Sequence, residues 1–186
     1  MMGRSHVVLA GAAYAALAAR PFETPFGTFE APVLGGLSAD PWASLLVSCL
    51  VAACCGLGPD IDKGGSTASR SLGLPTRVLS WGIEHSFGHR GGFHSLLATL
   101  GAYLLGNLLG GLLGVTGLGA LVAFGWAMHL LTDAWTVHGI PLFWPLSAAR
   151  VRLPPWLSTG SWLEAVTLTV SLVGLTAYAA WPYVQV

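Results

Sequence analysis

The sequence predicts an all-α protein of one domain, residues 1–186, folded as a polytopic membrane helical bundle with about five transmembrane helices. Apolar residues make up 54% of the chain and charged residues only 9%, with a mean hydropathy of +0.68. Soluble domains carry about 25% charged residues, so a soluble domain is excluded, as are disordered, collagen-like and coiled-coil chains. Because eight basic residues are balanced by eight acidic ones, the chain offers no basic surface for nucleic acid.

Five apolar segments approach the roughly 17–25 residues that a membrane-crossing helix needs. They run over about 6–19, 42–58, 94–113, 118–135 and 162–183. The first segment is short and resembles a secretory signal peptide, with Arg4 before the apolar stretch and Arg20 after it. The polar His6 inside the stretch favours a retained helix, and cleavage is the alternative.

The third segment carries three glycines at a spacing of four residues, Gly106, Gly110 and Gly114. Small residues at this spacing share one helix face and let a second helix approach closely. The pattern therefore predicts a close helix contact, and it could also serve a homodimer.

The basic residues predict the orientation of the chain. With five spans, seven of the eight lie on one side of the membrane and only Arg20 on the other. The seven are Arg4, Lys63, Arg70, Arg77, Arg90, Arg150 and Arg152. Since cytoplasmic loops are enriched in Lys and Arg, we expect a multi-pass protein of the inner or plasma membrane, with a cytoplasmic N-terminus and an outside C-terminus.

The histidines and aspartates map to the cytoplasmic ends of the expected spans or to the loop 59–93. They comprise all six histidines and three of the four aspartates: His6, His85, His89, His94, His129, His138, Asp60, Asp62 and Asp133. Ionisable groups at or within spans are costly, so they normally face a partner or a cavity. We therefore expect these side chains to converge at the cytoplasmic face.

Two short motifs carry carboxylates. His129 and Asp133 stand four residues apart, so they share one helix face and can ligate one metal, or the carboxylate can orient the imidazole. A buried hydrogen bond is the commoner role for such a pair alone. Asp60 and Asp62 follow a helix stop, and an extended chain there would send both to one side. They could bridge two cations, or they could belong to a simple turn.

A third motif is a glycine-rich stretch of ten residues that contains His85, His89 and His94. The alternative is that these are ordinary surface histidines in a loop. Together, the three motifs supply enough ligands for two metal ions with open positions for water. Neutral imidazole and carboxylate ligands suit zinc, iron, manganese or nickel. Since unpaired polar groups are expensive at this depth, a metal site at the cytoplasmic face is favoured over independent buried polar groups.

These motifs resemble those of the LexA-regulated, membrane-bound metal-dependent hydrolase family, the YdjM-like inner-membrane proteins. The matching strings cover most of the chain from His6 to about Arg152. They are Gly58-Pro-Asp-Ile-Asp-Lys63, Ser66 to Arg70, His89-Arg-Gly-Gly-Phe-His-Ser95, His129-Leu-Leu-Thr-Asp133, Thr136-Val-His-Gly139 and Leu142-Phe-Trp-Pro-Leu146. This chain has Phe93 where the family usually has a threonine.

The resemblance implies a set of metal ligands: His6, Asp60, Asp62, His89, His94, His129 and Asp133. Of these, Asp62 or Asp60 is the best candidate to bridge two ions that activate a water. Glu84 and His85 are candidates for proton transfer, or they form one face of an interfacial helix.

Cations and hydroxyls beside these ligands are candidates for binding a substrate. Lys63, Arg70 and Arg90 could hold a phosphate, with Arg90 also close to the reacting group, or they could only set topology and contact lipid headgroups. Ser66 could bind phosphate too, although capping a helix is favoured.

A metal site at headgroup depth favours an amphiphilic or lipid-linked substrate, with membrane lipids as its surroundings. We expect a metal-dependent hydrolase that acts on a phosphoester rather than a carboxylic ester or an amide. The main alternative is a divalent-metal transporter or sensor without catalysis, since intramembrane His and Asp are typical of ion pathways. A catalytically inactive scaffold is a third alternative.

Overall fold

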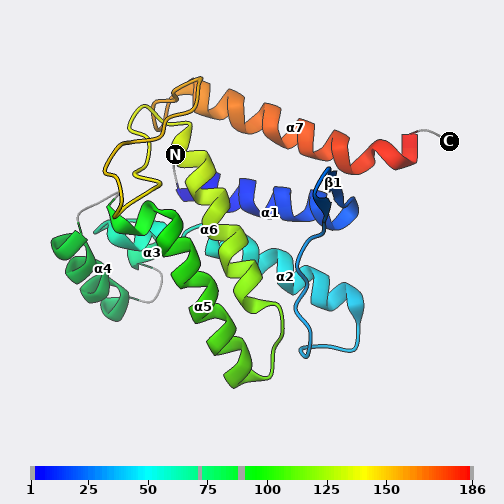
Figure 1. The fold of residues 1–186 in the computed structure, drawn as a ribbon. Helices are drawn as coiled ribbons and strands as arrows, with labels where there is room; N and C mark the ends of the chain where they lie inside the picture. Colours follow the sequence, from blue (N-terminus) through cyan, green and yellow to red (C-terminus); the bar gives the residue numbers. More distant parts are fainter. Residues whose placement is uncertain (1–2, 71–72, 88–90, 185–186) are drawn as a thin grey trace.

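The computed structural model describes residues 3–70, 73–87 and 91–184, and it is mostly helical (Figure 1). The long helices are α1 (Gly3–Ala19), α2 (Pro41–Cys55), α5 (Leu96–Leu113), α6 (Leu118–Ala134) and α7 (Trp162–Val184). Each expected apolar segment is therefore a helix, within a few residues of the expected bounds. Shorter elements join α2 to α5: the 3₁₀ helix η1 (Pro59–Asp62), α3 (Thr67–Arg70), α4 (Leu74–Phe87) and the 3₁₀ helix η2 (Gly92–His94).

Among the described residues, three helical segments are long and apolar enough to cross a membrane: Pro41–Asp62, Leu96–Leu113 and Trp162–Trp181. The helix α6 is apolar but shorter, with 17 residues, and α1 also has 17. Most of the apolar side chains of α5 and α7 point away from the protein, as expected for helices surrounded by lipid. A multi-pass membrane protein is thus supported, while the number of five crossings and the orientation of the termini stay predictions.

Small residues bring α5 and α6 into close contact. A Cβ atom added at Gly106 would lie 2.7 Å from the Cα atom of Gly119, and one at Gly110 would lie 2.6 Å from the carbonyl oxygen of Val115. Both glycines are buried. The glycine pattern predicted from the sequence is therefore used inside the chain, between two consecutive helices. Whether the chain also forms a homodimer stays a prediction.

The helices α1, α2 and α6 enclose the main apolar cluster. Tyr14, Leu34, Ala52 and Leu121 form its buried centre, and the hydroxyl of Tyr14 donates to the carbonyl oxygen of Pro32 at 2.9 Å. This packing fixes α1 and α6, which carry site residues, and α2, which leads into η1. The helix α7 runs alongside α1 (Figure 1).

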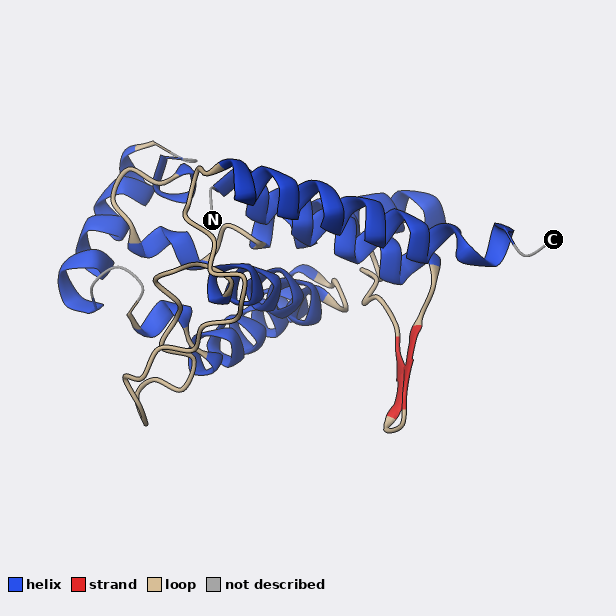
Figure 2. Ribbon diagram, turned by 90° about the horizontal axis from the view of Figure 1, so that it is seen from above, coloured by secondary structure: helices blue, strands red, loops and turns tan. Residues whose placement is uncertain are grey.

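The loop between α1 and α2 contains the antiparallel hairpin of β1 (Phe22–Thr24) and β2 (Gly27–Phe29). Figure 2 shows this hairpin projecting away from the helices. Phe26 at its tip is 99% exposed, which agrees with a loop that lies at a lipid interface.

Candidate metal centre

Side chains from four separate segments meet at one end of the bundle. They are His6 of α1, Asp60 and Asp62 of η1, His94 of η2, and His129 and Asp133 of α6. Apart from Asp60, these residues are at most 1% exposed. The predicted convergence of distant residues is therefore found for these six side chains. Of the other expected site residues, His89 and Arg90 lie outside the described residues.

A close approach between α2 and α6 positions this end of the bundle. A Cβ atom at Gly58 would lie 2.5 Å from the ring of Trp126, and one at Gly125 would lie 2.5 Å from the carbonyl oxygen of Ala52. A side chain at Gly58 would displace the ring of Trp126, and one at Gly125 would collide with the backbone of α2. The contact places η1, which follows α2 directly, beside the last two turns of α6.

The segment with Asp60 and Asp62 is a 3₁₀ helix rather than the extended chain that we expected, so that detail of the prediction was wrong. With three residues per turn, residues two apart do not share a face. The two carboxylates accordingly reach different histidines. Asp60 lies near the Nε2 atom of His129, and Asp62 lies beside the Nδ1 atom of His94.

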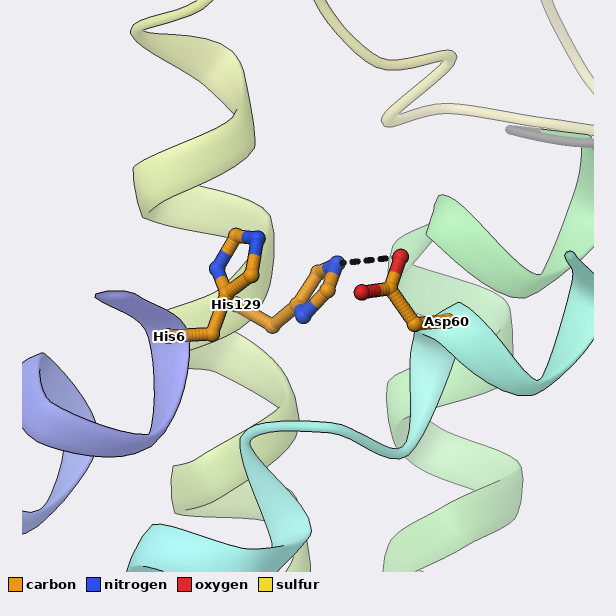
Figure 3. Close-up of side chains that lie close together, drawn as sticks. All are labelled: His6, Asp60 and His129. Atoms are coloured by element: carbon orange, nitrogen blue, oxygen red, sulfur yellow. Dashed lines mark ion pairs between the residues drawn. The ribbon is translucent and has the colours of Figure 1, made fainter. Parts of the chain in front are cut away.

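The first group of potential ligands contains His6, Asp60 and His129, with one ligand atom of each lying within 4.8 Å of the others. The imidazole rings of His6 and His129 are stacked, with ring centroids 3.8 Å apart. The Nε2 atom of His129 lies 3.8 Å from Oδ1 of Asp60. Figure 3 shows the three side chains converging from α1, η1 and α6.

The second group contains His94, His129 and Asp133, again within 4.8 Å. The Oδ2 atom of Asp133 lies 3.7 Å from Nε2 of His94 and 3.8 Å from Nε2 of His129. Its other oxygen, Oδ1, lies 3.4 Å from Nε2 of His6. The two groups therefore share His129, and the carboxylate of Asp133 stands between all three imidazoles.

Each of the three histidines is oriented through its Nδ1 atom. In His129 this atom donates to the carbonyl oxygen of Gly56 at 2.7 Å, and in His94 it lies 3.0 Å from Oδ2 of Asp62. In His6 it lies 2.6 Å from the hydroxyl oxygen of Thr132. That hydroxyl has carbonyl acceptors in its own helix, so it accepts from the imidazole. The Nε2 atoms of His94 and His129 thereby face each other, and that of His6 faces the carboxylate of Asp133, as in metal sites where a partner on the other ring nitrogen orients each histidine.

The facing Nε2 atoms make this arrangement costly without a cation. Those of His94 and His129 lie 3.2 Å apart, and with both Nδ1 atoms donating, each Nε2 of a neutral ring presents a lone pair to the other. The Nε2 atom of His6 is buried without a hydrogen-bond partner among the described residues. Burying acceptors in this way costs free energy. Imidazole nitrogens with carboxylate oxygens fit a divalent transition-metal ion.

Asp62 holds a different place from the other expected ligands. It lies beside the Nδ1 atom of His94, on the far side of that ring from the facing nitrogens, and neither ligand group includes it. Asp133, whose two oxygens face different imidazoles, has the better geometry for a carboxylate shared between two ions.

The expected substrate-binding and proton-transfer residues surround the loop after η1. Lys63 and Arg70 are exposed. The hydroxyl of Ser66 donates to the carbonyl oxygen of Asp60 at 2.7 Å and accepts from the backbone N–H of Ser69 at 3.0 Å. It therefore fixes the loop and caps α3, which was the favoured alternative.

The two proton-transfer candidates lie on α4. Glu84 is half-buried and accepts from the backbone N–H of Gly64 at 2.7 Å. His85 is exposed and stacks on Trp81, with ring centroids 5.6 Å apart. Glu84 thus tethers the loop that carries Lys63, whereas His85 follows the alternative of an interfacial helix face.

Sequence reasoning gave no role to Thr132 or to the carbonyl of Gly56. It placed Glu164 at the membrane interface or facing the site and did not predict its pairing with Ser5. The motif His129-Leu-Leu-Thr-Asp133 contained the threonine, but only the position of α1 shows that it holds His6. Glu164 is buried and accepts from the hydroxyl of Ser5 and the backbone N–H of Gly160, both at 2.7 Å. This pair fastens α7 to the turn of α1 that carries His6.

Comparison with known proteins gives a family match over residues 1–185, to the family described as YdjM inner membrane protein. The uncharacterized protein YvsG of Bacillus subtilis (strain 168) is 37% identical over 110 residues, covering 59% of this chain and 64% of that protein. Inner membrane protein YdjM of Escherichia coli (strain K12) and that of Shigella flexneri are each 36% identical over 114 residues, covering 60% of this chain and 52% of theirs.

The chain thus matches less than two thirds of the length of these relatives. No solved structure matches it. The family match covers nearly all of its residues, including the segments that carry the centre described above. This chain belongs to the YdjM inner membrane protein family.

Proposed function

We propose that this protein is a membrane-embedded, metal-dependent hydrolase that acts on a lipid or lipid-linked phosphoester at the cytoplasmic leaflet. The observation that carries the proposal is the approach of the His94 and His129 Nε2 atoms to 3.2 Å beside the carboxylate of Asp133. Three imidazoles and two carboxylates brought together from four chain segments are costly to bury unless a cation satisfies them.

The proposed ligands are His6, Asp60, His94, His129 and Asp133, and we propose two divalent ions from the set zinc, manganese, iron and nickel. A neutral imidazole has one lone pair on Nε2, so His129 can ligate only one ion. The second ion would rely on the remaining ligands, with Asp133 shared. A bound cation would supply a Lewis acid that activates water and stabilises charge on a phosphoryl oxygen.

The other residues of the centre orient these ligands and limit the access of water. Asp62, Thr132 and the carbonyl of Gly56 hold the three imidazoles from behind. Asp60, whose side chain is 15% exposed, is the most accessible of the five proposed ligands. The substrate would therefore approach along the loop after η1.

Two cations on that loop suit an anionic group. Lys63 follows η1 directly, and the guanidinium of Arg70 folds over Gly65, where a Cβ atom would lie 3.3 Å from it. Both are exposed. Exposed cations beside a metal centre favour phosphate over a neutral ester or amide.

The depth of the centre favours an amphiphilic substrate. Asp60 and Asp62 lie at the end of the candidate span Pro41–Asp62, and His94 comes just before the candidate span Leu96–Leu113. The centre is thus at the level where apolar helices end, which is the level of lipid headgroups. A phosphoester attached to a lipid can reach this level without leaving the bilayer.

The apolar cluster beyond the centre argues against an ion pathway. Tyr14, Leu34, Ala52 and Leu121 fill the bundle there, whereas transporters place polar groups along their path. Metal uptake into proteoliposomes that contain the protein would reverse this preference and favour a transporter.

The test uses the purified full chain in lipid nanodiscs. Bound metals are quantified by mass spectrometry, and phosphate release is measured from phospholipids and soluble phosphoesters with each metal added. We expect turnover that is lost in Asp133→Asn and kept in Asp40→Asn, since Asp40 caps the other end of α2. A protein that binds metal but hydrolyses none of these phosphoesters contradicts the proposal.

A further inference from the structure

A long apolar groove lies on the surface of α5 and α6, with a volume of about 430 Å³. We propose that it binds one hydrocarbon chain of a membrane lipid and thereby places the headgroup of that lipid at the metal centre. The inference rests on the proposed function for the identity of that lipid as substrate. Chain binding itself depends only on the groove.

The shape of the groove follows from the helical repeat. Leu97, Gly101, Leu105 and Leu109 line it at successive spacings of four residues, so they form one stripe along α5. The missing side chain at Gly101 hollows the stripe, since nothing lies within 4 Å of a Cβ atom built there. From residue 97 to residue 109 the stripe spans about 18 Å, close to the roughly 15 Å of hydrocarbon in one leaflet.

One end of the groove meets the metal centre. Phe93, which lines it, precedes His94, and the indole N–H of Trp126 donates to the carbonyl oxygen of Phe93 at 3.1 Å. Trp126 lies three residues before His129, on the adjacent turn of α6. A chain in the groove therefore extends away from the centre, and its polar end lies at the depth of His94.

The same end is closed by an aromatic ring. Trp144 packs against Gly92, where a Cβ atom would lie 2.9 Å from the ring. A lipid in the groove therefore has its hydrocarbon end along α5 and its headgroup end beneath an indole, which suits the headgroup level of a membrane.

The surroundings of the groove argue for lipid as its occupant. The helix α5 is a candidate span whose apolar side chains mostly face outward, so lipid chains are the medium around it. The hydrophobic effect alone does not draw a lipid chain to Leu and Phe side chains, because the surrounding lipid is equally apolar. A hollow that fits one chain adds van der Waals contacts with the residues that line it, which selects a bound chain over bulk lipid.

The experiment places the full chain in nanodiscs of phosphatidylethanolamine and phosphatidylglycerol with a trace of phospholipid that carries a diazirine in its acyl chain. After illumination, mass spectrometry locates the labelled residues. We expect labelling concentrated between Leu97 and Leu109 and at Trp126, and a several-fold loss of that labelling in Gly101→Leu. The matched control is Gly111→Leu, the same change on the same helix at a second position with open space and outside the groove.

A second measurement tests the link to substrate. In Gly101→Leu, hydrolysis of a long-chain phosphoester should fall relative to hydrolysis of a short-chain one, with the loss in KM, while Gly111→Leu should match the unmodified chain. Metal content should be the same in both variants.

The outcomes separate the two proposals. Three results would each contradict lipid-chain binding in the groove. They are labelling spread evenly around α5, equal labelling of the two glycine variants, and cross-links between two copies of the chain at the groove. Groove labelling without hydrolysis of any phosphoester overturns the proposed function and supports chain binding. Hydrolysis without groove labelling contradicts lipid-chain binding in the groove and leaves the proposed function standing.

Discussion

The Nε2 atoms of His94 and His129 lie 3.2 Å apart, while the Nδ1 atom of each ring is bound elsewhere, to Asp62 in one case and to the carbonyl of Gly56 in the other. Two neutral imidazoles in this arrangement point lone pairs at each other. A cation between or beside them converts that repulsion into ligation.

Replacing His129 should abolish tight metal binding. This residue belongs to both ligand groups. It would ligate only one of the two ions, but the second ion would share Asp133 with the first, so His129→Ala should weaken the binding of both. Metal content of the purified protein, measured by mass spectrometry, should fall to background. The control is His138→Ala, since His138 is exposed and belongs to neither group. Equal metal content in the two variants would show that the convergent imidazoles are not ligands.

Asp62→Asn should weaken metal binding without removing a ligand. The carboxylate beside Nδ1 of His94 makes that ring a stronger ligand, and such partners contribute about 10–100-fold in affinity. The matched control is Asp40→Asn, because asparagine caps a helix as well as aspartate does. Isothermal titration with zinc provides the measurement. A complete loss of binding in Asp62→Asn would instead show that Asp62 is itself a ligand.

Thr132→Val should also weaken metal binding, because Thr132 orients the imidazole of His6. Valine keeps the branched shape of threonine but removes the oxygen that accepts from Nδ1 of His6, so the ring loses its fixed orientation. We expect metal affinity to fall by about 10-fold or more. Thr169→Val is the control, since its exposed hydroxyl donates to the carbonyl of Ala165 in its own helix and lies outside the centre. Unchanged affinity in Thr132→Val would exclude an orienting role.

Metal should stabilise the folded protein. Because the ligands come from α1, η1, η2 and α6, an ion that binds only the folded state raises the free energy of unfolding, by about 2.7 kcal/mol at 100 times Kd. Thermal unfolding in detergent, followed with and without a chelator, should show a higher Tm with metal. The same comparison in His129→Ala should show no difference.

Gly106→Ala should destabilise the bundle. The new methyl group would lie 2.7 Å from the Cα atom of Gly119, and forcing α5 from α6 costs about 1–3 kcal/mol. Gly111→Ala, where a Cβ atom meets nothing within 4 Å, should leave Tm unchanged or slightly higher. A change of oligomeric state without a loss of stability would instead assign the glycine pattern to a homodimer.

The helices and the shared face of His129 and Asp133 could be predicted from the sequence, because they depend on local properties. Apolar runs of sufficient length form helices in a membrane since every backbone group must be satisfied internally. A spacing of four residues puts two side chains on one face of a helix wherever that helix lies. The convergence of six of the nine expected residues also followed, since costly polar groups at one depth need one another. The expectation was wrong for His85 and His138, which are exposed.

The roles of individual residues were decided by tertiary structure. The 3₁₀ turn at η1 directs Asp60 and Asp62 to different histidines, because residues two apart in such a turn do not share a face. Thr132 became the partner of His6 only through the placement of α1 against α6. Gly106 and Gly110 of α5 contact the segment of α6 for the same reason. Local sequence specifies which face of a helix can be approached closely, and only the packing of the whole chain specifies which element approaches it.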